Sequence, residues 1–280
     1  MTAVAMATSA SMPGPGIQAL TKKTSLALST SQVARRGLLR YFRTPQIVVL
    51  GTIQGAMFLL IFRYVFGGAV SVHGTSYVDF LIPGFVMTSV LFSGMSASTA
   101  VADDLQQGFV DRLRSLPVPR GCFLYGRALA DTVFNFWGLV VVTAVGFGVG
   151  FRPHGGTADA LAAFGLCVAF AFAFEWLFIL LGLVAGTPQA AQGMSMLVFP
   201  FTFVSSAYVP VSSMPGWMQA FAQHQPITYM SDAVRALALG RGGRALFGHS
   251  ATYFVTWSLV WAVGAVAVFA PLAVARYSRS

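Results

Sequence analysis

The chain has 280 residues, of which 56% are hydrophobic and 9% are charged, and its mean hydropathy is +0.72. Soluble domains carry about 25% charged residues, so the composition excludes an ordinary water-soluble protein and predicts an all-helical polytopic membrane protein. The net charge of +9 would favour nucleic acid for a soluble protein, but beside apolar segments it indicates membrane lipids with anionic headgroups and no nucleic-acid partner.

The N-terminal region precedes the first apolar segment. Residues 1–23 are rich in small side chains, Pro and Gly and lack the basic and apolar regions of a signal peptide, so we expect a disordered lead. The membrane domain occupies 24–280. Within it, 24–43 mixes leucines and aromatic side chains with four arginines, which suits a helix in the cytosolic interface. The alternative is a basic flank of the first span.

Six apolar segments are long enough to cross a membrane. They lie at about 46–66, 80–102, 123–150, 159–186, 194–211 and 250–274. An even number of crossings puts both termini on one side of the membrane. When that side is the cytosol, most arginines and lysines also fall there, as the positive-inside rule requires. We therefore expect a multi-pass protein of the bacterial cell membrane with both termini in the cytosol.

A charged segment separates the second and third spans. Asp103 and Asp104 stand where a helix N-terminus would follow the second span, since acidic side chains favour the positive end of the helix dipole. Pro117 and Pro119 must end that helix, because proline lacks a backbone N–H and disfavours helix in the preceding residue. We predict a cytosolic helix over about 103–119; the alternative is a solvated loop whose arginines fix the topology.

Polar residues inside the spans are few. Glu175 falls near the middle of the fourth span, where an ionised carboxylate costs about 2.5 to 3.5 kcal/mol, so we expect it to be neutral or to face protein or water. It would hold a polar group of a substrate or couple helix movement; the alternative is an interhelical hydrogen bond. Arg127 and Asp131, four residues apart, predict a local ion pair near the cytosolic interface.

The outer part of the chain follows the fifth span. Turn-forming residues punctuate 212–249, and the stretches 217–224 and 228–239 have helical composition but are too short or too charged to cross. We expect short helices there that dip into the outer leaflet or lie on it before the last span.

The sequence argues against catalysis by this chain. Lys22 and Lys23 stand in no Gly-Lys-Ser/Thr phosphate loop. The histidines are scattered and the cysteines unpaired, so no metal site is expected. Ser96 in Ser93-Gly94-Met95-Ser96 is a candidate intramembrane nucleophile, but small residues in a span more often mark close helix packing.

Two blocks of sequence resemble a known family. The first comprises Gly108, Asp111-Arg112-Leu113-Arg114-Ser115-Leu116-Pro117-Val118-Pro119-Arg120, Gly126-Arg127 and Asp131. The second comprises Tyr208-Val209-Pro210-Val211, Met214-Pro215-Gly216-Trp217, Phe221, Gln225-Pro226-Ile227-Thr228-Tyr229 and Ala233-Val234-Arg235-Ala236-Leu237. In this order, framed by six spans, they resemble ABC-2 type transporter permeases of the daunorubicin-resistance type, which are antibiotic and lipid exporters. His224-Gln225 before Pro226 departs from the asparagine of many members.

The resemblance implies a transport subunit rather than an enzyme. It implies two kinds of partner: a second permease copy or paralogue, and a separate ABC ATP-binding subunit. This chain would bind no cofactor, and the partner subunit would hydrolyse ATP. The helix after the second span would be the coupling helix that contacts the ATPase, through Gly108, Asp111, Arg112, Arg114 and Pro117.

The resemblance also places the transport route. In the family, spans one and five face the partner permease and border the route. The fifth span here combines a kink, hydroxyl groups and aromatic rings, so we expect substrate contacts at Phe201, Thr202, Ser205 and Ser206, with Glu175 as a further candidate. For any one of these residues, ordinary packing against neighbouring helices or lipid is the alternative.

The expected function is ATP-driven export of a hydrophobic or amphipathic compound, such as a drug, antibiotic or lipid. One alternative within the family is export of a lipid-linked glycan or cell-wall polymer, which a wider, more polar passage would favour. Alternatives from other classes are an ATPase-independent carrier and a membrane-embedded hydrolase.

Overall fold

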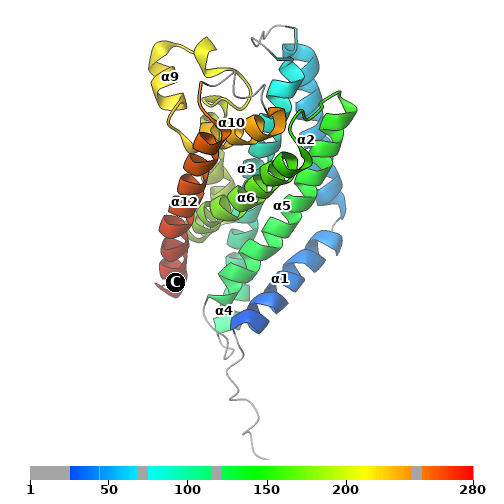
Figure 1. Cartoon of the computed structure of the whole chain (residues 1–280). Helices are drawn as coiled ribbons and strands as arrows, with labels where there is room; N and C mark the ends of the chain where they lie inside the picture. Colours follow the sequence, from blue (N-terminus) through cyan, green and yellow to red (C-terminus); the bar gives the residue numbers. More distant parts are fainter. Residues whose placement is uncertain (1–25, 44, 69–74, 115–120, 241–247, 280) are drawn as a thin grey trace, which may run out of the picture.

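The structure is a computed structural model that describes residues 26–43, 45–68, 75–114, 121–240 and 248–279 (Figure 1). All regular elements in these ranges are helices, which confirms the all-helical class. The predicted disordered lead, 1–23, lies outside the described residues. In chain order the elements are α1 (Leu26–Arg43), α2 (Pro45–Ile61) with a π-helical turn (Phe62–Phe66), α3 (Tyr77–Gln106), α4 (Phe109–Arg114), α5 (Cys122–Gly148), α6 (Thr157–Ala185), α7 (Pro188–Met196), α8 (Phe199–Phe203), a 3₁₀ turn (Val211–Ser213), α9 (Gly216–Ala222), α10 (Pro226–Leu239) and α12 (Ala251–Arg279).

Five helical segments in the described ranges are long and apolar enough to cross a membrane. They are Val49–Phe66, Tyr77–Gln106, Cys122–Gly148, Thr157–Ala185 and Ala251–Ser278. Each coincides with one of the predicted spans. Their length follows from uninterrupted apolar sequence, since a hydrocarbon layer requires about 20 such residues per helix.

The predicted fifth span, 194–211, is not one long helix. The chain forms α7, turns at Leu197 and Val198, forms the short α8 and then leaves helical conformation after Phe203. Pro200 lies in the first turn of α8, where its missing N–H is tolerated. The sixth crossing therefore stays a prediction, since this segment would have to cross as a broken helix.

Local sequence signals set several helix ends. The Ser76 hydroxyl accepts the backbone N–H of Asp79 at 3.1 Å and caps α3. Gly186 ends α6 with a φ of 71°, a left-handed conformation that favours glycine. Thr187 then caps α7 by accepting the N–H of Ala190 at 3.3 Å. This compact turn sends α7 back along the bundle, where it packs against α3 and α6.

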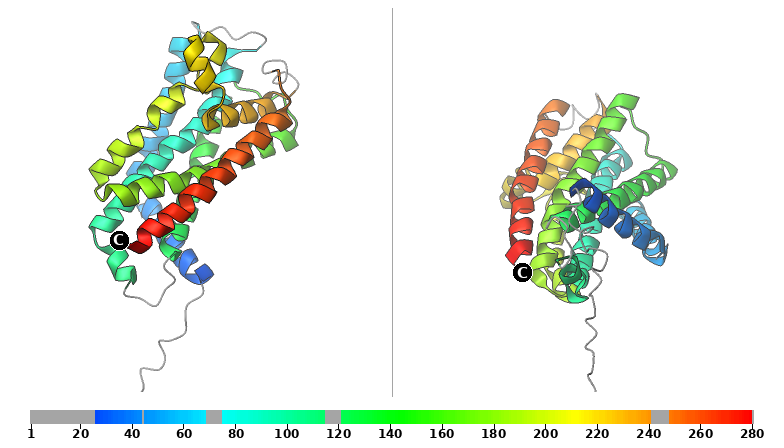
Figure 2. Two further views of the ribbon diagram at one scale, coloured as in Figure 1. Left: turned by 90° about the vertical axis from the view of Figure 1, so that its left-hand side faces the viewer. Right: turned by 90° about the horizontal axis from the view of Figure 1, so that it is seen from below.

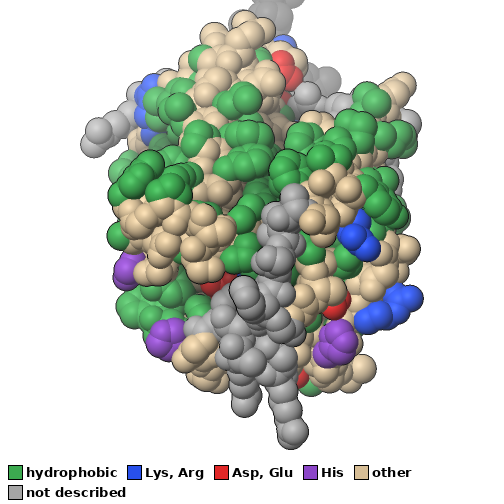
Figure 3. Space-filling view, turned by 90° about the horizontal axis from the view of Figure 1, so that it is seen from above, with side chains coloured by type: hydrophobic (Ala, Val, Ile, Leu, Met, Phe, Trp, Pro, Cys, Tyr) green, Lys and Arg blue, Asp and Glu red, His purple; other side chains and the backbone are tan. Residues whose placement is uncertain are grey.

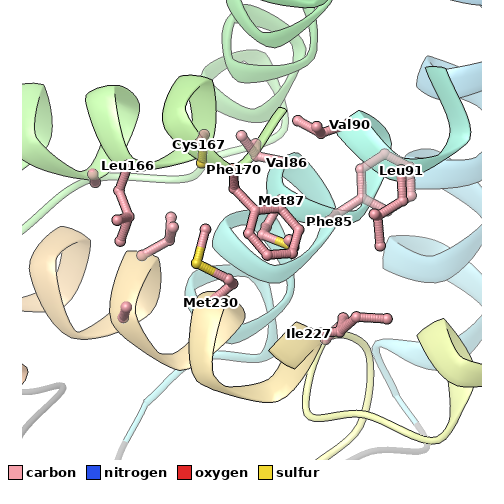
Figure 4. Close-up of a cluster of buried hydrophobic side chains, with 14 of the residues drawn as sticks. Phe85, Val86, Met87, Val90, Leu91, Leu166, Cys167, Phe170, Ile227 and Met230 are labelled. Carbon is pink, nitrogen blue, oxygen red and sulfur yellow. The ribbon is translucent and has the colours of Figure 1, made fainter. Parts of the chain in front are cut away.

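The core lies between α3, α6 and α10 (Figure 4). Figure 4 shows Phe85 and Met87 of α3, Phe170 of α6 and Met230 of α10 meeting in one buried cluster. Small residues bring the long helices close together: a Cβ on Gly182 would lie 2.5 Å from the carbonyl oxygen of Ser98. The α3–α6 pair is therefore the rigid centre on which the other helices pack.

The bundle has two different ends. The helices α1 and α4 and the C-terminal end of α12 lie together at one end, and α9 and α10 lie at the other, with α10 at a steep angle to the long helices (Figures 1 and 2). We call these the α4 end and the α9 end. Seen from the α9 end, hydrophobic side chains cover much of the visible face, with histidine and charged side chains scattered among them (Figure 3).

The segment after α3 differs from the predicted helix over 103–119. Asp103 and Asp104 belong to the last turn of α3, and α4 begins only at Phe109. The reason is tertiary: Asp104 is buried, and its Oδ2 lies 3.5 Å from a guanidinium nitrogen of Arg127 on α5. Gly108, with a φ of 66°, then turns the chain.

Candidate functional site

The helix α4 is anchored in the bundle and presents a basic residue outward. Val110 is buried in a hydrophobic cluster shared with α3, α5, α6 and α12, whereas Arg112 on the same helix is exposed. Arg112 also donates its backbone N–H to the carbonyl of Gly108 at 3.2 Å, so the turn and the helix form one unit. Asp111 and Arg114 lie in α4 but their side chains are outside the description, and Pro117 lies outside the described residues.

Phe109 connects α4 to its neighbours. The guanidinium carbon of Arg36, on α1, lies 3.5 Å from the centre of the Phe109 ring, a cation–π contact. On its other side the ring centre lies 5.9 Å from that of Phe123 on α5, and Phe123 stacks on Tyr277 of α12 at 5.8 Å. Phe109 thus links α4 directly to α1 and α5, and through Phe123 to α12.

A buried polar cluster lies behind α1. The Nε of Arg127 donates to Asp131 Oδ2 at 2.6 Å, which confirms the predicted ion pair. Tyr41 of α1 donates its hydroxyl to Asp131 Oδ1 at 2.7 Å, and its ring stacks on Phe134 with centres 4.0 Å apart. Asp104 completes the surroundings of Arg127 at 3.5 Å. The sequence indicated only the i, i+4 pair, because Tyr41 and Asp104 come from other helices.

Glu175 joins this cluster from α6. Its side chain is 1% exposed, it lies close to Asp131 and Arg127, and its Oε1 has no hydrogen-bond partner. Two carboxyl groups form a hydrogen bond only when one of them carries the proton. Because Asp131 already accepts from Arg127 and Tyr41, a bond between the two carboxyl groups would need the proton on Glu175. The interhelical hydrogen bond and the transport role that the sequence left open for Glu175 both stay predictions.

A cavity of about 370 Å³ lies between the central turns of α2, α3 and α5. Its edges are formed by Tyr41 of α1, Met196 of α7 and Phe199 of α8. Aromatic rings such as Phe58 and Trp137 make up much of the wall. Neutral polar side chains interrupt the aromatic wall on α2, α3 and α5. Among the described residues that line the cavity, none is charged.

The predicted substrate residues of the fifth span lie outside this cavity. Thr202 donates to the carbonyl of Phe199 at 2.7 Å, and Ser205 donates to the carbonyl of Thr202 at 2.6 Å. Phe201 is 48% exposed on the surface of the bundle. Hydroxyl groups in an apolar setting bond to the preceding turn when nothing else is near. The structure thus does not bring these residues together with Glu175, which lies on α6 in the cluster behind α1.

A second buried arginine, at the α9 end, joins α10 to α3 and to the segment after α8. Arg235 of α10 is fully buried and donates to the carbonyls of Phe80 at 2.7 Å and Ser206 at 2.9 Å and to Asp232 Oδ1 at 2.7 Å. Ser206 also donates its hydroxyl to Asp232 at 2.7 Å. Burial raises the pKa of Asp232 to about 6 and lowers that of Arg235 to about 10, and the opposite charge of the partner opposes each of these shifts. The sequence placed Arg235 in the second of the two resembling blocks without giving it a role.

The family model that describes the ABC-2 type transporter matches residues 29–239 of this chain. The chain belongs to the ABC-2 type transporter family. The matched residues include α4, the polar cluster and all the lining residues of the cavity. The resemblance carried by the two sequence blocks is confirmed.

Individual ABC-2 permeases show how far the likeness extends. The chain is 32% identical over 243 residues to the daunorubicin resistance ABC transporter permease protein DrrB1 of Streptomyces coeruleorubidus, covering 86% of this chain and 83% of that protein. It is 29% identical over 210 residues to the probable doxorubicin resistance ABC transporter permease protein DrrC of Mycobacterium tuberculosis, with coverages of 73% and 75%. The inner membrane transport permease YadH of Escherichia coli is 26% identical over 228 residues, with coverages of 77% and 87%.

The described part of this ABC-2 chain offers no metal centre. No group of three or more His, Cys, Asp or Glu side chains there is placed to hold an ion. The three carboxyl groups near Arg127 surround a guanidinium, which occupies the position that a cation would need.

Proposed function

We propose that this chain is the membrane subunit of an ATP-driven exporter that moves a hydrophobic or amphipathic compound out of the cell. Membership of the ABC-2 family over most of the chain carries the proposal. The cavity adds support, because an apolar space with a few polar groups in mid-bundle suits such a compound. The names of two relatives refer to resistance to daunorubicin and to doxorubicin, so these are the first compounds to test.

The α4 end is the proposed contact with the ATP-binding subunit and faces the cytosol. Arg112 is exposed on a helix that is otherwise fixed by Val110 and Phe109. A short helix held in this way transfers a rigid-body displacement to the spans better than a flexible loop does. Gly108 supplies the turn, and Asp111, Arg114 and Pro117 complete the proposed contact. ATP is hydrolysed by the partner, and this chain itself performs no catalysis.

A second permease copy or a paralogue is the proposed partner in the membrane. In the most apolar 18-residue stretch of each span, the buried share is 6% for Val49–Phe66 and 72% for Tyr77–Gln106. Leu50 is 65% exposed and Tyr64 72%, and Leu197, in the turn between α7 and α8, is 69% exposed. These helices correspond to the spans that face the partner in the family. Burial of this surface against the second subunit leaves the α3–α6 centre unchanged.

The volume of the cavity favours a small compound over a polymer. Pockets for small molecules have volumes of about 300 to 1,000 Å³, and the cavity, at about 370 Å³, lies near the lower limit. A glycan or cell-wall polymer needs a continuous polar passage, whereas aromatic and aliphatic side chains form most of this wall.

Export is tested in cells that produce the chain together with an ABC ATP-binding subunit encoded beside it. We expect less daunorubicin fluorescence inside these cells than in cells that produce either subunit alone. Replacing the phosphate-loop lysine of the ATP-binding subunit must abolish the difference, because that lysine positions the nucleotide phosphates. Equal accumulation with the active and inactive ATP-binding subunits would contradict ATP-driven export of this compound and favour a carrier or another substrate.

A further inference from the structure

The chemistry of the cavity wall identifies a class of ligand more narrowly than the family does. We propose that the cavity between α2, α3 and α5 is the binding site for the exported compound, and that it selects the uncharged form of an aromatic molecule with an O–H or N–H donor, so that an amine such as that of daunorubicin gives up its proton before it binds. Asn135 is the residue that receives this donor. The inference rests on the proposed function, but it concerns which molecules bind, and the two are tested separately.

The position and size of the cavity suit a compound that crosses the membrane. The lining residues come from the central turns of α2, α3 and α5, which place the cavity midway along the spans. A volume of about 370 Å³ accommodates a compound of several fused or linked rings. Aromatic side chains on three helices, Phe58, Phe92 and Trp137, give flat apolar surfaces that favour stacked or edge-on contact with rings of the ligand.

The described residues of the cavity wall carry polar groups but no charge. The polar side chains without an aromatic ring that line the cavity are Thr52, Gln54, Ser89, Ser93, Ser96 and Asn135. All of these are neutral, and no charged group is found among the described lining residues. An ion brought to this depth would lose its hydration without gaining a counter-ion, which costs several kcal/mol. A neutral ligand avoids that cost.

The acidic cluster does not change this conclusion. Asp131 lies one turn from Asn135 on α5, but its Oδ1 accepts from Tyr41 and its Oδ2 accepts from Arg127. The carboxylate is therefore already compensated, and the Tyr41 side chain contacts both the carboxylate and the cavity. A cationic ligand finds no unpaired carboxylate on this wall.

The side chain of Asn135 has a buried acceptor without a hydrogen-bond partner. Asn135 is 4% exposed, lines the cavity and has no hydrogen-bond partner at Oδ1. A buried carbonyl oxygen left without a partner destabilises the empty site. A ligand hydroxyl or neutral N–H supplies the missing donor. The ligand is thus expected to combine an aromatic body with such a group.

Three matched benzophenones test the proposal on the permease with its ATP-binding subunit in lipid nanodiscs. They are 4-(hydroxymethyl)benzophenone, which is neutral and carries a donor, 4-(aminomethyl)benzophenone, a cation, and 4-carboxybenzophenone, an anion. Irradiated benzophenone reacts readily at methionine, and Met95 and Met196 line the cavity whereas Met57, on the exposed surface of α2, does not. Mass spectrometry of the irradiated protein gives the labelling of Met95 relative to Met57.

We expect saturable labelling of Met95 by the neutral probe and at least about tenfold weaker labelling by each charged probe, equivalent to about 1.4 kcal/mol. Asn135→Leu removes the acceptor, and Gly138→Leu fills the cavity, since a Cβ at Gly138 meets no atom within 4 Å. Both variants should reduce Met95 labelling about tenfold. Thr143→Val removes a buried hydroxyl of α5 outside the cavity lining and is the matched control.

Equal relative labelling of Met95 by the neutral and charged probes, or no labelling of Met95 above Met57, would overturn the proposal. This comparison needs no variant, so it holds even if a substituted protein fails to fold. Labelling of Met95 that Asn135→Leu and Gly138→Leu both leave unchanged would also overturn it. Export and co-purification of the ATP-binding subunit that persist in those cases would leave the proposed function standing.

Discussion

Buried arginines are compensated in two ways, by backbone carbonyls with one carboxylate or by two carboxylates. Arg235 is surrounded by backbone carbonyls and one carboxylate, and Arg127 by two carboxylates, with Glu175 close to Asp131. Membrane-embedded ionisable groups require such partners, because lipid offers none. The four-residue spacing of Arg127 and Asp131 was sufficient to predict their pair. The other contacts join residues far apart in sequence, which no local pattern encodes.

Glu175 gives the prediction at this scale. If Glu175 donates to Asp131 through a protonated carboxyl group, a glutamine retains an N–H donor in its place, so Glu175→Gln should keep the unfolding free energy within about 1 kcal/mol. Glu175→Ala should lose about 1 to 3 kcal/mol, because it removes the donor. Thermal unfolding of the purified protein measures both. If glutamine destabilises the protein as much as alanine does, the carboxyl group is ionised and does not donate to Asp131.

Export by Glu175→Gln separates the two roles considered for this residue. A purely structural hydrogen bond predicts normal export at normal protein level. Loss of export with unchanged stability would show that Glu175 contributes to transport itself.

The elements differ in how well sequence pattern anticipates them. Long apolar runs predicted α3, α5, α6 and α12 to within a few residues, since hydropathy alone sets the length of a span. The break between α7 and α8 was not predicted, because the turn at Leu197 and Val198 lies in an apolar run. The predicted interfacial helix is present as α1, but it packs along α5 rather than only contacting lipid.

The docking of α1 depends on a small residue. Gly37 faces α5, where an added Cβ would lie 2.8 Å from the Cβ of Ala130. Gly37→Leu should therefore displace α1 and expose its amides, which we expect to exchange at least about tenfold faster with deuterated solvent. Hydrogen exchange followed by mass spectrometry measures this.

Gly264→Leu is the matched control for α1, since no atom lies within 4 Å of a Cβ at Gly264 on α12. It should leave exchange in α1 unchanged. Protection of α1 that is equal in Gly37→Leu and the unsubstituted protein would show that α1 does not depend on close packing against α5.

The whole molecule combines a rigid centre with two specialised ends. Family membership and the all-helical class followed from composition and two sequence blocks. The cavity did not, because its wall is assembled from α2, α3 and α5, and the residues suggested for the route lie outside it. The fifth span was favoured because the family places it along the route and because it combines a kink, hydroxyl groups and aromatic rings. In the structure Thr202 and Ser205 donate to carbonyls of the preceding turn, and their role in transport stays a prediction.

Co-purification of the ABC ATP-binding subunit with the membrane chain is the most direct test of the account. Reversing the charge at Arg112 and Arg114 together should abolish co-purification while leaving membrane insertion intact, because both residues belong to α4. Arg152→Glu changes an exposed arginine in the connection between α5 and α6 and should have no effect. Undiminished recovery of the ATP-binding subunit with the α4 variant would contradict the claim that α4 is the site of coupling.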